Sequence, residues 1–184
     1  YYGDQGDSIL AENVSPGTDF LGESTQAWDK ATDPASRAGI RVVAMRFGLV
    51  LDAKADLIKK TLPLVKAGLG GKLGNGRQYM SWIALNDLTR AIEHVLVTPG
   101  IIGPINMSSF NTLTNHEYTK TLGRILSKPT LFAVPYFALR LSVGEMAGPM
   151  TASVRMDSSK LMDSGFQFKY SDLESALREI LGRP

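Results

Sequence analysis

The chain has 184 residues, of which 43% are hydrophobic and 21% are charged. This length suits one ordinary domain, and the composition excludes a disordered chain because enough apolar residues are present to form a core. The net charge of +2 is small and the basic residues are scattered, so nucleic acid is not expected as a partner. Without cysteine the chain forms no disulfide or thiolate metal site, and no metal site is predicted. No apolar run reaches the ~18 residues of a membrane span, so no membrane partner is expected.

The first third of the chain predicts a loop, a helix and a buried strand. Residues 1–19 are rich in Gly, Asp, Ser and Pro and predict a long loop. The chain opens on Tyr1-Tyr2-Gly3 without an initiator Met, from which we expect a preceding segment. Residues 20–35 carry apolar side chains at near-helical spacing, with Trp28 expected in the core. Residues 40–51 are β-branched and almost continuously apolar, which is typical of a strand buried on both faces of a parallel sheet.

The rest of the chain alternates between helical and extended patterns, which predicts an α/β fold. Thr114 and Glu117, and likewise Ser171 and Glu174, have the spacing of a capping box at a helix start. Only two predicted strands have the character of sheet core, and two strands cannot satisfy their own edges, so we expect further strands from elsewhere. The short strands are predicted near residues 79–83 and 105–107, and the helices over residues 56–67, 86–97, 114–126, 136–146, 159–164 and from 171 to about 182.

A glycine-rich stretch, residues 68–76, loosely matches the glycine pattern of a dinucleotide fingerprint. Such a fingerprint follows a strand and opens a helix, so that phosphates meet the helix N-terminus. Here a predicted helix precedes the stretch and a predicted strand follows it. The sequence therefore argues against a pyrophosphate site and indicates either a flexible turn or a loop over a small-ligand cleft.

Several segments resemble the epimerase-like branch of the extended short-chain dehydrogenase/reductases. The resemblance lies in Tyr1-Tyr2-Gly3, in residues 46–51 (RFGLVL) and most specifically in residues 68–83 (GLGGKLGNGRQYMSWI). The tail agrees, since residues 165–168 (GFQF) and 172–177 (DLESAL) resemble the small conserved carboxyl-terminal domain of that family. The resemblance implies the carboxyl-terminal part of a Rossmann-type fold with a doubly wound parallel sheet, followed by a small, mostly helical domain.

The same resemblance implies a division of the chain, a cofactor and a partner. Residues 1–130 would form the carboxyl-terminal part of the NAD(P)-binding domain, with interleaved substrate-side segments at about residues 52–84. Residues 131–184 would form the small carboxyl-terminal domain. The implied cofactor is NADP, with NAD as the alternative, and the implied partner is a small-molecule substrate, while a homodimer stays open. A bacterial cytoplasmic location is expected, with an organelle stroma or matrix as the alternative.

By this resemblance, the nicotinamide end of the cofactor lies near Tyr2 and near the end of the strand through residue 46. Arg46, Phe47 and Gly48 are the further cofactor contacts, since ligands bind at the carboxyl ends of parallel strands. Tyr2 and Tyr1 are the only nearby phenols for proton transfer and are therefore the candidate catalytic residues. Their alternative role is an aromatic wall against the cofactor. Arg46 is either a sheet-end arginine paired with a carboxylate or a cation that orients a ligand.

The substrate side of the cleft is implied to lie along the glycine-rich stretch and the strand after it. For two of these residues, Arg77 and Gln78, the alternative is an ordinary solvated loop side chain. Trp82 is expected in the core, where its indole N–H needs a hydrogen-bond partner, and it could also form a cleft wall. The predicted substrate contacts are Gly70, Gly71, Arg77, Gln78 and Trp82.

The usual acid–base pair of short-chain dehydrogenases is missing from the sequence. That pair is Tyr-x-x-x-Lys, whose lysine lowers the tyrosine pKa toward neutrality. No lysine stands four residues beyond any of the six tyrosines, and in the resemblance Phe20 and Ser24 occupy the positions of the pair. The family also usually carries His and Asp where Ala84 and Asn86 stand, which weakens the transfer of any family activity.

Two functions therefore compete on the sequence. The first is an NADP(H)-dependent oxidoreductase or nucleotide-sugar-epimerase-like protein of unknown substrate. The second is a non-catalytic NADP-binding sensor or interaction protein with a degenerate Tyr-x-x-x-Lys site. A third hypothesis, an independent structural domain, predicts that residues 1–184 unfold cooperatively by themselves.

Overall fold

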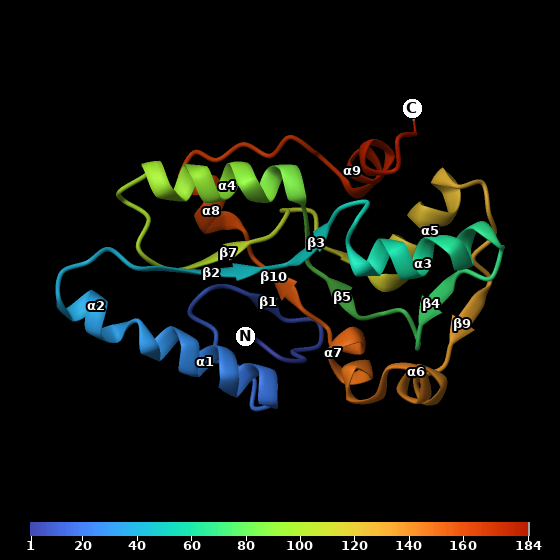
Figure 1. Ribbon diagram of the computed structural model, residues 1–184, viewed down its shortest axis with the longest axis horizontal. Coiled ribbons are helices and arrows are strands. Elements are labelled where there is room, and N and C mark those ends of the chain that lie inside the picture. Colours follow the sequence, from blue (N-terminus) through green and yellow to red (C-terminus); the bar gives the residue numbers. More distant parts are fainter. Residues whose placement is uncertain (184) are drawn as a thin grey trace.

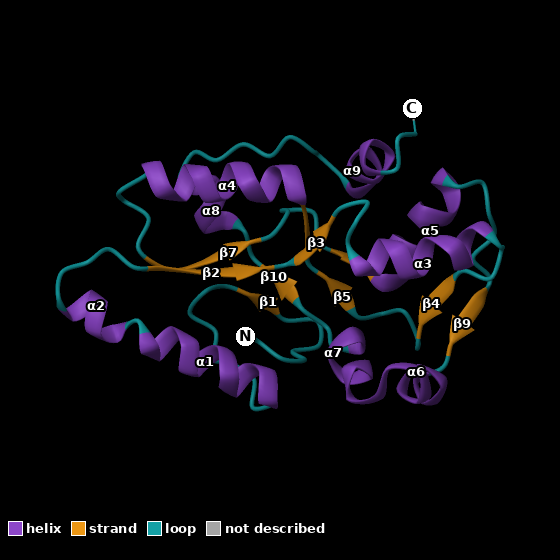
Figure 2. Cartoon of the chain, viewed as in Figure 1, coloured by secondary structure: helices purple, strands orange, loops and turns teal. Residues whose placement is uncertain are grey.

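The computed structural model describes residues 1–183 and shows an α/β arrangement of short strands and surrounding helices (Figure 1, Figure 2). No helix in this described range is long and apolar enough to cross a membrane. The strands are β1 (Ile9–Leu10), β2 (Val43–Phe47), β3 (Leu49–Leu51), β4 (Gly71–Leu73), β5 (Tyr79–Met80), β6 (Trp82–Ala84), β7 (Gly103–Met107), β8 (Leu113–Thr114), β9 (Phe132–Val134) and β10 (Arg155–Met156). The helices are α1 (Phe20–Ala31), α2 (Asp33–Arg37), α3 (Asp56–Lys66), α4 (Leu85–Val97), α5 (Asn115–Ile125), α6 (Tyr136–Val143), α7 (Ala147–Thr151), α8 (Ser159–Asp163) and α9 (Leu173–Ile180).

The strand predicted over residues 40–51 is divided at Gly48 into β2 and β3. β2 pairs in parallel with β7, and β3 pairs in parallel with β6. At the division, the amide of Gly48 donates to the carbonyl oxygen of Met107 (3.0 Å), and the amide of Leu49 donates to that of Ser81 (2.7 Å). A Cβ atom at residue 48 would lie 3.0 Å from the Ser81 carbonyl carbon. Glycine therefore allows the strand to change neighbours from β7 to β6 at this point.

β2 is less buried than the sequence predicts. Four of its five residues are half-buried and Phe47 is 52% exposed. In Figure 1, α4 lies on one side of β2 and β7 and α1 lies on the other. Val43 and Met45 pack in the apolar cluster of α4 and β7, whereas α1 leaves Phe20 79% and Trp28 72% exposed. The prediction that Trp28 lies in the core is therefore wrong. Among residues 1–183, β2 hydrogen-bonds to one strand only, which is β7.

Two apolar clusters hold the helices against the strands, because each helix presents apolar residues three or four positions apart. The first joins α3, α5 and α9 over β3 and β6 and includes Leu51, Ile58, Trp82, Leu122 and Leu177. The second joins α4 and α8 to β7 and includes Leu88, Ala91, Val95, Ile105 and Leu161.

The helix starts of the carboxyl-terminal half follow the sequence signals in part. Thr114 and Glu117 form the predicted capping box at the start of α5, with both reciprocal hydrogen bonds present. At α9 the cap is Asp172 rather than the predicted Ser171, and its side chain accepts from the amide three residues later (2.8 Å). An Asx cap satisfies the same free amide as a Ser cap, so the helix starts one residue later than expected.

The elements of residues 131–184 are spread across the molecule. β9 pairs with β4, β10 pairs with β1, and α9 packs against α5. The carboxylate of Asp87 on α4 accepts from the backbone amides of Lys169 (2.8 Å) and Tyr170 (3.3 Å). These contacts tie the carboxyl-terminal segment to the preceding elements, and the division at residue 131 stays a prediction.

Candidate functional site

The first loop and the end of β2 meet in a buried polar cluster. Tyr2 is 2% exposed, and its hydroxyl donates to Asn106 Oδ1 (2.7 Å) and accepts from Arg46 Nη1 (3.2 Å). Asn106 lies fully buried on β7 and donates through Nδ2 to the carbonyl oxygens of Leu10 (2.8 Å) and Asp157 (2.9 Å). The cluster therefore joins the first loop, the central strands and the segment after β10.

Arg46 is held from several sides. Nη2 pairs with Asp29 Oδ2 on α1 (3.1 Å), and Nη1 donates to the Glu12 carbonyl oxygen (2.8 Å). The guanidinium carbon lies 3.4 Å from the centroid of the Tyr1 ring, which is a cation–π stack. The buried Nε has no hydrogen-bond partner among the described residues. Of the two alternatives for Arg46, the sheet-end arginine paired with a carboxylate is the one that the structure shows.

The surroundings of Tyr2 favour a structural role over proton transfer. Burial raises the pKa of Tyr2, and the hydrogen bonds with Arg46 and Asn106 oppose that rise. A phenol with a raised pKa stays protonated at neutral pH, and here its proton is already donated to Asn106. Tyr1 stacks edge-on against the Tyr2 ring, with 5.1 Å between the centroids. Tyr2 is thus a buried, hydrogen-bonded residue, while the catalytic and aromatic-wall roles of the two tyrosines stay predictions.

An apolar cavity of about 620 Å³ lies beyond the carboxyl end of β2. Phe47 and Gly48, two predicted cofactor contacts, line it together with Gly70 and Gly71, two predicted substrate contacts. α3, α5 and α7 contribute further lining residues. The structure therefore brings these four predicted residues, which come from two segments more than twenty positions apart in the sequence, to one cavity.

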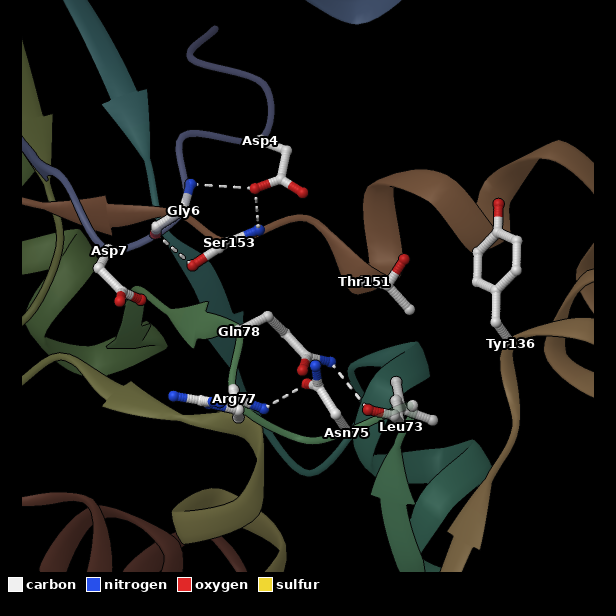
Figure 3. A pocket seen from close by; sticks show the side chains of 11 residues that line it. Asp4, Gly6, Asp7, Leu73, Asn75, Arg77, Gln78, Tyr136, Thr151 and Ser153 are labelled. Carbon is white, nitrogen blue, oxygen red and sulfur yellow. Dashed lines mark hydrogen bonds between the residues drawn. The ribbon is translucent and has the colours of Figure 1, made fainter.

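Arg77 and Gln78 lie at a different cavity, which is polar and measures about 410 Å³ (Figure 3). In Figure 3, Asp4 and Ser153 lie above Gln78 and Arg77, and the Asp4 carboxylate accepts from the Ser153 amide (3.2 Å). Gln78 is 8% exposed and donates through Nε2 to the Leu73 carbonyl oxygen (3.2 Å), whereas Arg77 is exposed. The predicted substrate wall is thus divided between two cavities.

Trp82 was predicted as a core residue and also as a possible cleft wall, and the structure confirms the core position. It is 2% exposed, and its indole N–H donates to the Asn111 carbonyl oxygen (2.8 Å). It is not among the residues that line either cavity, so the structure does not support a contact with substrate.

Close backbone packing explains why glycine stands at residue 71 of the glycine-rich stretch, and a pair of variants can test this explanation. A Cβ atom at Gly71 would overlap the Phe132 carbonyl group across the β4–β9 pair. We expect Gly71→Ala to lower the free energy of unfolding by about 1–3 kcal/mol, because backbone atoms must move apart. Gly148→Ala in α7 is the control, since its Cβ would meet nothing within 4 Å, and we expect no loss. Thermal unfolding followed by circular dichroism measures both, and equal losses would contradict the explanation.

Two residues of the site were missed by sequence reasoning. Asn106 stands between Ile105 and Met107 in a buried strand, and a polar side chain there signals a hydrogen-bonded cluster, since buried polar groups need partners. Tyr118 shares the apolar face of α5 with Leu122 and lines the 620 Å³ cavity. The spacing of Tyr118 predicts only a core position, so nothing in the sequence indicates that it borders a cavity.

One residue at the carboxyl end of β2 is open to a ligand. The half-exposed Phe47 ring lies at this strand end, where ligands of open α/β sheets bind, whereas the Nε of Arg46 is fully buried. The glycine-rich stretch follows α3, contains β4 and leads into β5, so it does not open a helix as a phosphate cradle must. Within residues 1–183, no group of His, Asp and Glu side chains is arranged to hold a metal ion.

Sequence comparison relates the chain to proteins of several bacteria and a plant. Residues 134–180 match a family model described as a domain of unknown function (DUF1731). The chain is 39% identical over 185 residues to the epimerase family protein Mb2239 of Mycobacterium bovis, covering 100% of this chain and 62% of that protein. It is 33% identical over 181 residues to the chloroplastic SDR39U1 homolog of Arabidopsis thaliana, covering 98% of this chain and 52% of that protein.

Solved structures agree with this relation. The crystal structure of human epimerase family protein SDR39U1 (isoform 2) with NADPH matches with a TM-score of 0.88 and 26% identity, over 99% of this chain and 62% of that one. The nucleoside-diphosphate sugar epimerase from Corynebacterium glutamicum matches with a TM-score of 0.75 and 35% identity, over 97% of this chain and 34% of that one. The chain thus spans about three-fifths of the length of the first of these relatives, at 62%. Over its whole length the chain is similar to epimerase family proteins, and its residues 134–180 match the carboxyl-terminal domain of unknown function.

Proposed function

We propose that the full-length protein binds NADP(H) and acts as an oxidoreductase on a small molecule held in the 620 Å³ cavity. The observation that carries this proposal is the position of the cavity at the carboxyl end of β2, where open α/β folds bind their ligands. Phe47 and Gly48 would border the nicotinamide, because they lie between that strand end and the cavity. The human SDR39U1 protein was crystallised with NADPH, which supports the choice of cofactor.

In this proposal the protein orients its ligands and excludes water. NADPH, when bound, supplies a hydride. The apolar side chains of α3 and α5 keep the cavity dry, and Arg46 holds Tyr1 in place beside the strand end. A dry site strengthens the few polar contacts that a substrate can make there.

A non-catalytic NADP-binding sensor is the second candidate, and one observation favours it. Phe20 and Ser24, which stand where the family's acid–base pair is usual, lie on α1, with the Phe20 ring exposed. The Ser24 hydroxyl donates to the Phe20 carbonyl oxygen (2.7 Å), as helical serines commonly do. Neither side chain titrates near neutral pH, so neither replaces a lysine-activated tyrosine.

Binding and turnover experiments on the full-length protein separate the two candidates. We expect NADPH to bind and to be consumed in the presence of at least one member of a panel of carbonyl compounds. NADPH binding is measured by its fluorescence and turnover by its absorbance. Tight NADPH binding without turnover above background would contradict the oxidoreductase and support the sensor. Absence of NADPH binding would contradict both candidates.

Phe47 offers a variant that tests where the cofactor binds. We expect Phe47→Asp to weaken NADPH binding roughly tenfold, because it removes an apolar contact and adds a negative charge beside the nicotinamide site. Leu141→Asp on α6 is the matched control, since Leu141 is 85% exposed and is not part of the cavity lining. Equal affinities of the two variants for NADPH would show that the cofactor does not reach the end of β2.

A further inference from the structure

The 620 Å³ cavity has an apolar lining without a charged side chain. Its lining residues within the described chain include no Lys, Arg, His, Asp or Glu. Hydrocarbon side chains surround most of it, among them Leu57, Leu64, Val65, Met80, Leu122 and Val134. A nucleoside diphosphate carries several negative charges, and burying them without a cation is costly. The lining therefore suits an uncharged, largely hydrocarbon ligand.

Three polar side chains of the lining, those of Thr61, Ser81 and Asn115, have hydrogen-bond partners within the protein. The Ser81 hydroxyl donates to the Val154 carbonyl oxygen (2.8 Å) and accepts from the Met156 amide (2.8 Å). The Asn115 side chain accepts from the Leu73 amide (2.7 Å). These groups fix the shape of the cavity, and their hydrogen bonds are used by the fold.

The Tyr118 hydroxyl is a fully buried polar atom that belongs to a residue of the lining. Tyr118 is 4% exposed, and its hydroxyl is buried without a hydrogen-bond partner of good geometry among the described residues. The Thr61 hydroxyl donates to the Leu57 carbonyl oxygen (2.7 Å), and its oxygen is the polar atom near the Tyr118 hydroxyl that can accept from it. Burial raises the pKa of Tyr118, so the phenol keeps its proton at neutral pH. A buried donor with a poorly placed acceptor is unfavourable, and a ligand acceptor in the cavity would offer it a hydrogen bond of better geometry.

We propose that the cavity binds an uncharged apolar molecule with a carbonyl group, and that the Tyr118 hydroxyl donates a hydrogen bond to the carbonyl oxygen. This inference rests on the proposed function for its biological meaning, since the ligand would be the carbonyl substrate of the oxidoreductase. The substrate class differs from the nucleoside-diphosphate sugar after which the Corynebacterium glutamicum epimerase is named. Tyr118 is a positioning residue of α5 in this proposal, because it orients the carbonyl group and transfers no proton.

A matched pair of ligands tests the hydrogen bond. Benzophenone and diphenylmethane have similar shapes, but only benzophenone has a carbonyl oxygen. We expect isothermal titration of the full-length protein with bound NADPH to show tighter binding of benzophenone. Tyr118→Phe should weaken benzophenone binding roughly three- to tenfold and leave diphenylmethane binding unchanged, because one hydrogen bond is lost. An equal effect of the substitution on both ligands, or none on either, would overturn the role of Tyr118.

Two further variants control for folding and location. Tyr170→Phe removes another tyrosine hydroxyl, which donates to Glu179 Oε1 (2.9 Å) outside the cavity, and should change neither affinity. Ala152→Phe places a ring in the lining and should weaken the binding of both ligands. Since Tyr118→Phe breaks no hydrogen bond of good geometry, its melting temperature should not fall. Unchanged binding of both ligands to Ala152→Phe would show that they bind elsewhere.

Two further measurements test the substrate class and the proposed function separately. UDP-glucose tests the substrate class. We expect UDP-glucose to bind more weakly than benzophenone, and tighter binding of UDP-glucose would overturn the apolar class. The titrations are repeated without NADPH. NADPH could fail to bind while Tyr118→Phe still weakens benzophenone binding. That result would contradict the proposed function but would support the proposed ligand site.

Discussion

Asn106→Ala is expected to lower the free energy of unfolding by about 3 kcal/mol or more. The side chain is fully buried and makes three hydrogen bonds, one from Tyr2 and two to the carbonyl oxygens of Leu10 and Asp157. Truncation leaves these three groups buried without their partner, and each such group costs about 1–3 kcal/mol. For a chain of this size, that loss corresponds to a fall in melting temperature of roughly 6–12 °C.

Asn86→Ala is the matched control for this loss. Asn86 lies exposed in the first turn of α4, so its truncation should change stability by about 0.5 kcal/mol or less. Thermal and urea unfolding of the full-length protein measure both variants. A small loss for Asn106→Ala, comparable to that of the control, would show that water replaces the amide and that the cluster is not closed.

Tyr2→Phe extends the test within the same cluster. It removes the hydroxyl that donates to Asn106 and accepts from Arg46, and should cost about 1 kcal/mol. Because Tyr2 and Asn106 are in contact, the double variant should lose less than the two single losses added together. Additive losses would mean that the hydroxyl and the amide act independently.

The sequence predicted most of the longer helices, because their apolar periodicity indicates a buried face, and it predicted the central strand from a continuous apolar run, although β2 is only half-buried. It did not predict the division of the strand at Gly48, where the pairing changes from β7 to β6. That division depends on a close approach of residue 48 to the Ser81 backbone, which no local pattern encodes. The prediction for Trp28 failed for a related reason. Apolar spacing predicts that a face is to be buried but does not identify the surface that buries it, and here α1 leaves that ring 72% exposed.

The candidate site was predicted in part, and the error has a geometric cause. Phe47, Gly48, Gly70 and Gly71 line one cavity, as expected of a strand end facing the glycine-rich stretch. Arg77 and Gln78 do not join them, because the chain reverses at Gly74 and Gly76, both with positive φ (57° and 74°). A turn between neighbouring residues sends their side chains to different surfaces, and a linear motif does not encode that direction.

Asp87→Ala is expected to detach the carboxyl-terminal segment from α4 and to lower the free energy of unfolding by about 2–4 kcal/mol. The Asp87 carboxylate is 2% exposed and accepts from the amides of Lys169 (2.8 Å) and Tyr170 (3.3 Å) and from Arg90 Nη1 (2.8 Å). The carboxylate therefore pairs with a cation of its own helix and with the backbone of the carboxyl-terminal segment. Loss of a buried acceptor leaves two amides without partners, which costs far more than loss of a surface ion pair.

Hydrogen exchange can distinguish a local opening of the carboxyl-terminal segment from a loss of stability of the whole fold. Hydrogen exchange at the Lys169 and Tyr170 amides should quicken more than exchange in β7, since only the former lose their acceptor. Asp56→Ala is the control, because Asp56 is 84% exposed and its ion pair with Lys60 is long (3.9 Å), so a change of about 0.5 kcal/mol or less is expected. If exchange quickens equally throughout the molecule, the carboxylate stabilises the whole fold without anchoring this segment. The carboxyl-terminal segment would then be held mainly by the apolar contacts of α9 with α5.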